Sequence, residues 1–201
     1  MIVAYTGTPG SGKTYHAVLN LWERIKYGHN VIANIPLQLP EKKKQLKYDF
    51  WETWEITPGK LIQYSNDLKQ SRGWDRVPED YIYLVIDEAQ LIFNCRNWND
   101  KDRKEWVSFF TQHRKLGYKV ILICQMARML DKQIYGLLEY EIIHRKFSNF
   151  GFKGMILSLV FLSPSCFVAV RVWSAMNERI DCEIFRFHKR IAKLYDTTRI
   201  Y

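Results

Sequence analysis

The sequence has few of the features that mark secreted, metal-bound or membrane-spanning proteins. Its four cysteines, Cys95, Cys124, Cys166 and Cys182, are scattered, with no C-x-x-C pair and no matching histidine spacing, which argues against disulfides and a structural metal. The start of the chain lacks the basic segment and cleavage site of a secretory signal. The longest apolar run, Met155 to Leu162, is under half the roughly 20 residues needed to cross a bilayer. These absences favour a reducing, intracellular compartment and predict no transmembrane helix in this sequence.

What is present suffices for one folded domain. The chain has 201 residues, of which 47% are hydrophobic, so it can bury a core without disulfides. We expect a single domain over residues 1–201. The net charge is +9, from 30 basic and 21 acidic residues. A positive field of this kind attracts polyanions such as nucleic acid or an anionic membrane face, although a generally solvated surface and a bound nucleotide explain the charge equally well.

Strand-like and helix-like segments alternate along the chain. Apolar β-rich runs lie at 2–6, 30–35, 81–86 and 119–124, with further strands near 141–147 and 166–173. Helical patterns lie at 13–28, 57–70, around 106–116 and near 131–138, while the rest of 36–80 is irregular. This alternation predicts a three-layer α/β fold with a mainly parallel central sheet. Residues from about 140 to 201 form a small β-rich C-terminal part of the same domain, which ends in a basic segment, Arg186 to Lys193.

A phosphate-binding loop lies between the first strand and the first helix. It matches G-x-x-x-x-G-K-[ST] without a mismatch. The glycines allow main-chain N–H groups to converge on phosphate oxygens, and the helix N-terminus adds positive charge there. Lys13 would reach the β- and γ-phosphates of ATP, and the Thr14 hydroxyl would ligate Mg²⁺. The predicted nucleotide-binding residues are Gly7, Thr8, Pro9, Gly10, Ser11, Gly12, Lys13, Thr14 and Tyr15.

Two later strands end in polar residues suited to hydrolysis. The apolar run up to Ile86 delivers Asp87 to the carboxyl end of a buried strand, where its carboxylate would hold Mg²⁺ beside the loop. Glu88 follows directly and is the predicted general base for the attacking water. Gln125 follows the strand 120–124. If that strand lies beside the phosphate-loop strand, its amide would point towards the γ-phosphate and orient the water; the alternative is a hydrogen-bonded amide at a strand end.

An arginine from a neighbouring copy would complete such a site by neutralising charge in the transition state. Arg114 is the first candidate, and Arg103 and Arg145 compete with it. His113, on the apolar stripe of the same helix, is interpreted as a packed histidine. Met126 is likewise interpreted as a packing residue.

With these residues identified, the chain resembles the Zot family, named for zonula occludens toxin, which includes assembly ATPases of filamentous phages. The phosphate-loop elements are shared by many ATPases, whereas the later segments are more specific. The matching segments are Gly7–Thr14, Val85–Gln90, His113–Tyr118, Ile121–Gln125 and Leu194–Thr197.

The resemblance implies a RecA/FtsK-like fold with a polar sensor strand between the two motif strands. It also implies a ring of identical subunits, with a hexamer as the candidate size, that uses ATP and Mg²⁺ to extrude phage single-stranded DNA while coat protein assembles. Expected partners are other copies of the chain, phage coat and assembly proteins, and single-stranded DNA. The implied location is the host cytoplasm, at the cytoplasmic face of the inner membrane. Many members continue into a transmembrane helix, whereas this sequence ends at Tyr201, so membrane contact is expected through a missing segment or a partner chain.

Three other functions fit parts of the pattern. A small-molecule kinase fits the short length and the early loop, but an arginine-rich lid and an acceptor pocket do not stand out, and Glu88 is left unexplained. In a nucleotide-organised assembly scaffold, the nucleotide would hold an oligomer together without turnover. A helicase is suggested by Asp87-Glu88-Ala89-Gln90, although further helicase motifs are not evident.

Overall fold

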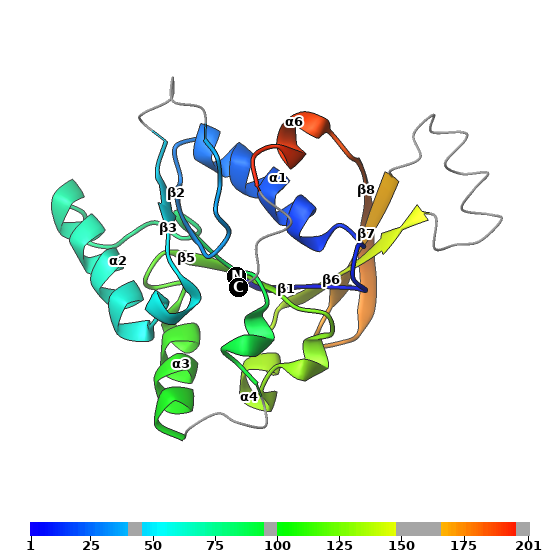
Figure 1. Cartoon of the computed structure of the whole chain (residues 1–201). Coiled ribbons are helices and arrows are strands. Elements are labelled where there is room, and N and C mark those ends of the chain that lie inside the picture. The colour runs from blue at the N-terminus through cyan, green and yellow to red at the C-terminus, as the bar shows by residue number, and fades with distance from the viewer. Residues whose placement is uncertain (40–45, 95–99, 148–165, 196–201) are drawn as a thin grey trace.

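A sheet of eight strands forms the middle layer of the computed structural model, which describes residues 1–39, 46–94, 100–147 and 166–195 (Figure 1). The strand order across the sheet is β3-β2-β4-β5-β1-β6-β7-β8. Several sequence features lie outside the described residues: Cys95, the apolar run 155–162 and the last two residues of the segment Leu194–Thr197.

The elements follow the predicted alternation closely. In chain order they are β1 (Ile2–Thr6), α1 (Lys13–Lys26), β2 (Asn30–Ala33), β3 (Tyr48–Phe50), η2 (Thr53–Glu55), α2 (Pro58–Arg72), β4 (Ile82–Ile86), η3 (Ala89–Leu91), α3 (Asp100–Gln112), β5 (Tyr118–Ile123), η4 (Ala127–Met129), α4 (Lys132–Tyr135), β6 (Tyr140–Lys146), β7 (Cys166–Trp173), β8 (Glu178–Arg186) and α6 (Lys189–Ala192). The Thr57 side chain accepts a hydrogen bond from the main-chain N–H of Lys60, as expected of an N-cap before Pro58.

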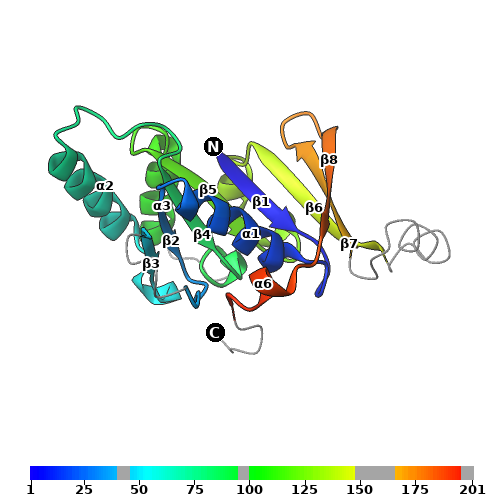
Figure 2. The same cartoon turned by 90° about the horizontal axis from the view of Figure 1, so that it is seen from above.

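Helices cover both faces of the sheet, which confirms the three layers. One apolar core lies between α1 and the sheet, where Val18, Leu21 and Ile25 pack on alternate residues of β1, β2, β4 and β5. The other lies beneath α2, α3 and α4, where Trp106, Phe109 and Phe110 meet the opposite side chains of the same strands. Figure 2, seen from above, shows α1 lying across the sheet with α6 beside it. Each central strand is therefore buried on both faces, which explains its continuous apolar sequence.

The three strands that carry the motifs lie side by side at the centre. Strand β5 pairs in parallel with β1 on one side and with β4 on the other. The sensor strand therefore lies between the two motif strands, as predicted. Because the three strands are parallel, their carboxyl ends lie side by side. The phosphate loop, Asp87 and Gln125 all follow these carboxyl ends.

The C-terminal strands extend the central sheet, so the predicted β-rich C-terminal part belongs to the same sheet as the rest of the domain. Strand β6 pairs in parallel with β1, and β7 and β8 add in antiparallel fashion. The sequence did not predict β8, because eight of its nine residues are exposed and its charged side chains hide the alternation of a half-buried strand. Nor did it predict β3, which has only three residues. These two strands are the edges of the sheet, and a bulge lies where β8 pairs with Arg171 and Val172 of β7.

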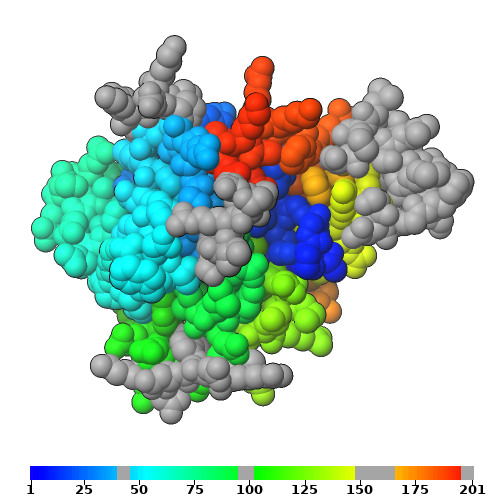
Figure 3. Space-filling model, in the orientation of Figure 1, coloured from blue at the N-terminus to red at the C-terminus, as the bar shows by residue number. Residues whose placement is uncertain are grey.

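The last described segment lies on the α1 face of the sheet and runs towards the residues that follow β2. After α6, the main-chain oxygen of Leu194 accepts a hydrogen bond from Gln38, and Tyr195 forms an isolated bridge with Leu37. In Figure 3 the red atoms of this segment lie across α1, while dark-blue atoms near the start of the chain remain visible beside them. No helix among the described residues is both long enough and apolar enough to cross a membrane.

Candidate nucleotide-binding site

The phosphate loop is held at both ends by main-chain hydrogen bonds. The N–H of Gly7 donates to the oxygen of Gln125 (3.1 Å), and the N–H of His16 donates to the oxygen of Gly12 (2.9 Å). Between these points, Lys13 Nζ donates to the main-chain oxygens of Gly7 (2.8 Å) and Thr8 (3.2 Å). The lysine ammonium thus lies over the loop, where it can transfer these contacts to phosphate oxygens.

The glycines explain why the loop keeps this shape. Gly7 has φ 137°, and a Cβ atom there would overlap the main-chain oxygen of His144. Gly10 has φ 73°, yet a Cβ atom there would meet nothing within 4 Å. The first glycine is therefore needed for close packing against β6, while the second faces open space at the tip of the loop. The residues present fit a phosphate chain approaching from that open side.

Thr14 and Asp87 meet directly, although 73 residues separate them. Thr14 Oγ1 donates to Asp87 Oδ2 at 2.9 Å. Hydroxyl and carboxylate oxygens are ligands that Mg²⁺ prefers, and Mg²⁺ in such sites also binds phosphate oxygens. The two predicted metal ligands are therefore brought together at the start of α1, beside Lys13.

Burial sets the electrostatics of this cluster. Asp87 is 5% exposed, and this burial raises the pKa of its carboxyl, although the hydrogen bonds from Thr14 and from the Glu88 N–H oppose the shift. Burial likewise lowers the pKa of Lys13, against the attraction of Asp87 and Glu88. The neighbouring groups therefore offset only part of the cost of burying the Asp87 carboxylate and the Lys13 ammonium in their charged forms. A cation beside Asp87 and an anion beside Lys13 would both relieve this cost, as Mg²⁺ and a nucleotide phosphate would do.

Asn34 is a site residue for which sequence reasoning had no signal. It follows β2, is 2% exposed, and bonds twice to the main chain of Asp87. Its Oδ1 accepts from the Asp87 N–H (2.7 Å), and its Nδ2 donates to the Asp87 oxygen (3.0 Å). The same Nδ2 also donates to Thr53 Oγ1 (3.0 Å). Asn34 therefore fixes the peptide that aims the Asp87 carboxylate.

Glu88 lies in a sharp turn directly after Asp87. Its φ of 50° is in the left-handed region, which is uncommon for a residue other than glycine. The Glu88 N–H donates to Asp87 Oδ1 (2.9 Å), and its carboxylate accepts a hydrogen bond from Gln90 Nε2. The turn therefore presents the predicted base beside the predicted metal ligand, with Gln90 as an orienting partner that the sequence did not single out.

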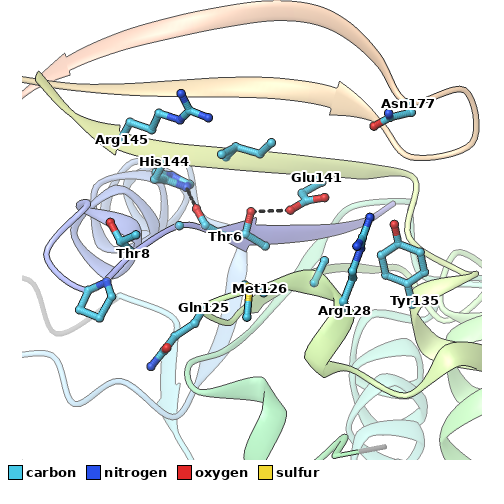
Figure 4. Close-up of a pocket in the computed structure, with 14 residues that line it drawn as sticks. Thr6, Thr8, Gln125, Met126, Arg128, Tyr135, Glu141, His144, Arg145 and Asn177 are labelled. Atoms are coloured by element: carbon cyan, nitrogen blue, oxygen red, sulfur yellow. Dashed lines mark hydrogen bonds between the residues drawn. The ribbon is translucent and has the colours of Figure 1, made fainter. Parts of the chain in front are cut away.

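Gln125 follows β5 at the same edge, as predicted. Its side chain is exposed and lines a cavity of about 860 Å³ that also touches Thr8, Arg128 and Arg145. Figure 4 shows its amide pointing away from Thr6 and Glu141. Met126, interpreted from the sequence as a packing residue, is instead 62% exposed and lines the same cavity, because the chain leaves the sheet at this point.

The three candidate arginines lie in different places. Arg114 belongs to a turn and not to the helix, because α3 ends at Gln112. It donates to Glu139 Oε2 at 2.6 Å. Glu139 directly precedes β6, so this pair lies at the amino-terminal ends of the parallel strands, away from the phosphate loop. Arg103 pairs with Asp131 (3.3 Å). Arg145 is exposed on β6 beside the loop. Arg114 therefore lies far from the phosphate loop of its own chain and is paired with Glu139.

Side chains of α1 tie the loop to the C-terminal strands. The Tyr15 hydroxyl donates to the oxygen of Arg186 (3.0 Å) and accepts from the N–H of His188 (2.8 Å). The Tyr15 side chain is therefore directed towards the C-terminal segment, and its main-chain N–H is the group left for a nucleotide. His16 Nδ1 lies 2.8 Å from His144 Nε2. His144 Nδ1 faces the oxygens of Thr6 and Ile142 and must donate to them, so its Nε2 accepts from His16.

Two sequence comparisons found proteins similar to this chain. A family model described as Zonular occludens toxin (Zot) matches residues 1–199. The gene 1 protein of Enterobacteria phage fd is 31% identical over 159 residues, which cover 77% of this chain and 45% of that protein. The chain therefore spans less than half the length of this phage relative.

Solved structures with low sequence identity share the fold. The N-terminal domain of zonular occludens toxin from Neisseria meningitidis has a TM-score of 0.59 at 19% identity, over 97% of this chain and 98% of that domain. The genome packaging NTPase B204 from Sulfolobus turreted icosahedral virus 2, in complex with ATP-gammaS, has a TM-score of 0.55 at 15% identity, over 92% and 96% of the two chains. The predicted α/β P-loop NTPase fold is confirmed.

Proposed function

Because the chain belongs to the zonular occludens toxin (Zot) family and is homologous to phage gene 1 proteins, we propose that it is a Mg²⁺-dependent ATPase motor. Its work is the assembly of a filamentous phage and the extrusion of its single-stranded DNA. The observation that carries the proposal is the 2.9 Å contact between Thr14 Oγ1 and Asp87 Oδ2 beside Lys13. It supports a metal-dependent phosphate site more strongly than a glycine turn alone would.

The proposed reaction is transfer of the γ-phosphoryl group to water. The water oxygen bonds to the γ-phosphorus, the bond to the β–γ bridging oxygen breaks, and the water proton passes to the Glu88 carboxylate. Lys13 offsets the charge that develops on the phosphate oxygens, and Gln125 orients the water. Mg²⁺ held by Thr14 and Asp87 would withdraw further charge from those oxygens. Gln90 keeps the Glu88 carboxylate in place through its hydrogen bond.

Phosphate release from ATP, measured with and without Mg²⁺, tests the proposal. Glu88→Gln should retain nucleotide but lose turnover roughly 100-fold or more, because a general base contributes about that much. Lys13→Ala should lose both binding and turnover. Glu79→Gln is the matched control, since Glu79 is exposed and pairs only with Arg76 in the described structure. If Glu88→Gln releases phosphate at the wild-type rate, the assignment of the base is wrong.

Two further outcomes would redirect the function. Phosphate appearing on a metabolite and not in water would indicate a small-molecule kinase. Normal phage export with Lys13→Ala would indicate a scaffold in which nucleotide only organises the assembly. The first experiment uses the wild-type protein, and the second uses the Lys13→Ala variant.

The proposed setting is a homo-oligomeric ring, with six subunits as the candidate size, at the cytoplasmic face of the host inner membrane. Coat and assembly proteins and single-stranded DNA are the proposed partners, and membrane contact would come from a further segment or a partner chain. The net charge of +9 supports contact with a polyanion. Arg145 is exposed beside the phosphate loop and is available to act as an arginine finger on a neighbouring subunit, whereas Arg114 would first have to leave Glu139, to which it donates at 2.6 Å.

A further inference from the structure

A cavity with an unusual lining lies between α1 and the sheet, towards the amino-terminal ends of the parallel strands and away from the phosphate loop. It measures about 260 Å³, and its walls include His16, Asn20 and Arg24 of α1. These residues are spaced by four, so they share one face of the helix. An amphipathic helix normally turns apolar side chains towards a sheet. This row is polar, and the space beside it has room for several water molecules.

Three cationic side chains from three separate elements reach this cavity. They are Arg24 from α1, Lys119 from β5 and Arg171 from β7. The Arg24 guanidinium and Lys119 Nζ each lie 5.4 Å from the centre of the Tyr83 ring, and Arg171 lies 5.9 Å from that of Tyr140. Cation–π contacts of this kind hold the charged groups in place without neutralising them.

Carboxylates balance part of this charge. Asp181 pairs with Arg171 itself at 3.2 Å, and Glu183, which also lines the cavity, lies 3.5 Å from His16 Nε2. Asp80 and Glu139 lie 3.5 and 3.7 Å from the amino group of Met1. Within the part of the chain that the structure describes, neither Arg24 nor Lys119 forms an ion pair. The lining of the cavity therefore carries three cationic side chains and one carboxylate, Glu183, and two of the cations have no ion-pair partner among the described residues.

Lys119 lies partly buried among these charges. Burial is the main cause that lowers the pKa of its ammonium; the attraction of Asp80 opposes the shift, Arg24 and Arg171 add to it, and Glu139 opposes it. Like charges brought together under a helix cost folding free energy unless an anion joins them. A bound phosphate group would supply the missing charge and would accept the N–H donors of two guanidinium groups.

We propose that this cavity is a second phosphate-binding site, separate from the phosphate loop, in which Arg24, Lys119 and Arg171 hold one phosphate group. The phosphate belongs either to the backbone of single-stranded DNA or to a free anion such as inorganic phosphate or pyrophosphate. Both sources present the same tetrahedral oxyanion to the three cations. The inference depends on the cavity alone and not on ATP hydrolysis at the other end of α1.

The test uses the full chain carrying Lys13→Ala, so that binding at the phosphate loop is weakened in every sample. Pyrophosphate is titrated calorimetrically in one arm, and a fluorescent oligodeoxythymidine is titrated over a salt series in the other. Adding Lys119→Met should weaken binding roughly tenfold or more, since a charge-assisted hydrogen bond is lost. Arg24→Gln should weaken it similarly. Lys47→Met is the matched control, because Lys47 contacts Gly28 and Tyr81 outside the cavity.

A stability measurement accompanies the titrations. Without added anion, Lys119→Met should unfold at the same or a higher urea concentration than its parent, because the substitution relieves like-charge repulsion. Pyrophosphate should raise the unfolding midpoint of the parent but not that of Lys119→Met. Binding by pyrophosphate identifies a free anion, and binding by the oligonucleotide alone identifies a DNA backbone. Equal affinity of the parent and both cavity variants in both arms, or binding in neither arm, would overturn the proposal.

Discussion

Replacing Asn34 by alanine should separate the positioning of Asp87 from the presence of its carboxylate. The substitution removes two hydrogen bonds to the main chain of Asp87, of 2.7 and 3.0 Å, and leaves a buried N–H and a buried carbonyl without those partners. Each such group costs about 1–3 kcal/mol. The free energy of unfolding should therefore fall by about 2–6 kcal/mol, which urea denaturation measures.

The same change should weaken the use of Mg²⁺ more than the binding of nucleotide. Asp87 keeps its carboxylate in Asn34→Ala, but the peptide that aims it is no longer fixed. The Mg²⁺ concentration for half-maximal phosphate release should rise several-fold, while the affinity for a fluorescent ATP analogue without metal stays near the wild-type value. A Mg²⁺ dependence identical to wild type, in protein shown to be folded, would refute this account of Asn34.

Asn30 provides the matched control, because it begins the strand that Asn34 follows. Among the described residues, its Nδ2 donates to the Tyr64 hydroxyl alone (2.8 Å), at the other end of β2 from the site. Asn30→Ala should lose about 1 kcal/mol of stability and leave the Mg²⁺ dependence unchanged. A shift in Mg²⁺ dependence with Asn30→Ala would mean that any loss of stability, and not the loss of the Asp87 contacts, weakens the site.

Two further predictions concern the loop and its histidine support. Gly7→Ala should cost several kcal/mol more stability than Gly10→Ala, because both have positive φ but only the Gly7 side chain would overlap main-chain atoms; equal unfolding midpoints would contradict the packing described for Gly7. Burial and the neighbouring His16 lower the pKa of His144 from 6.5 to about 3, so its contribution to stability is fully present above pH 6.5 and is lost as the pH falls towards 3. Between pH 7 and pH 4, the free energy of unfolding measured with urea should fall on the order of a few kcal/mol less for His144→Gln than for wild type; parallel curves would mean that His144 is not buried in its neutral form.

The parts of the site that the sequence predicted are those encoded by a few adjacent residues. The phosphate loop depends on glycines, Lys13 and Thr14 in fixed positions, and Asp87 follows a strand that is buried on both faces. Their meeting required only that the two strands be parallel and close together. Gln125 followed by the same logic, since β5 lies between them.

The parts that the sequence did not predict depend on distant partners. Asn34 has no motif of its own, because its role comes from a contact with a residue 53 positions later. The bond between His16 and His144 spans 128 positions, and neither imidazole stands out in its local pattern. Helix α3 ends before the apolar spacing does, because the main chain turns at His113, whose oxygen bonds to the N–H of Tyr118. Pairings of this kind come from the tertiary fold and leave no periodic signal.

The two edges of the sheet have a consequence for handling the protein at high concentration. Open strand edges invite pairing with other molecules, and short strands, bulges and charged side chains discourage it. Strand β3 offers only three residues. Strand β8 is longer but carries Glu178, Arg179, Asp181, Glu183 and Arg186, and it pairs with β7 through a bulge. Ile180 and Ile184 of β8 are 51% and 45% exposed. Salt conditions or substitutions that neutralise the charges around them would allow β8 to pair with a strand of another molecule. We therefore expect aggregation of this domain to begin at β8.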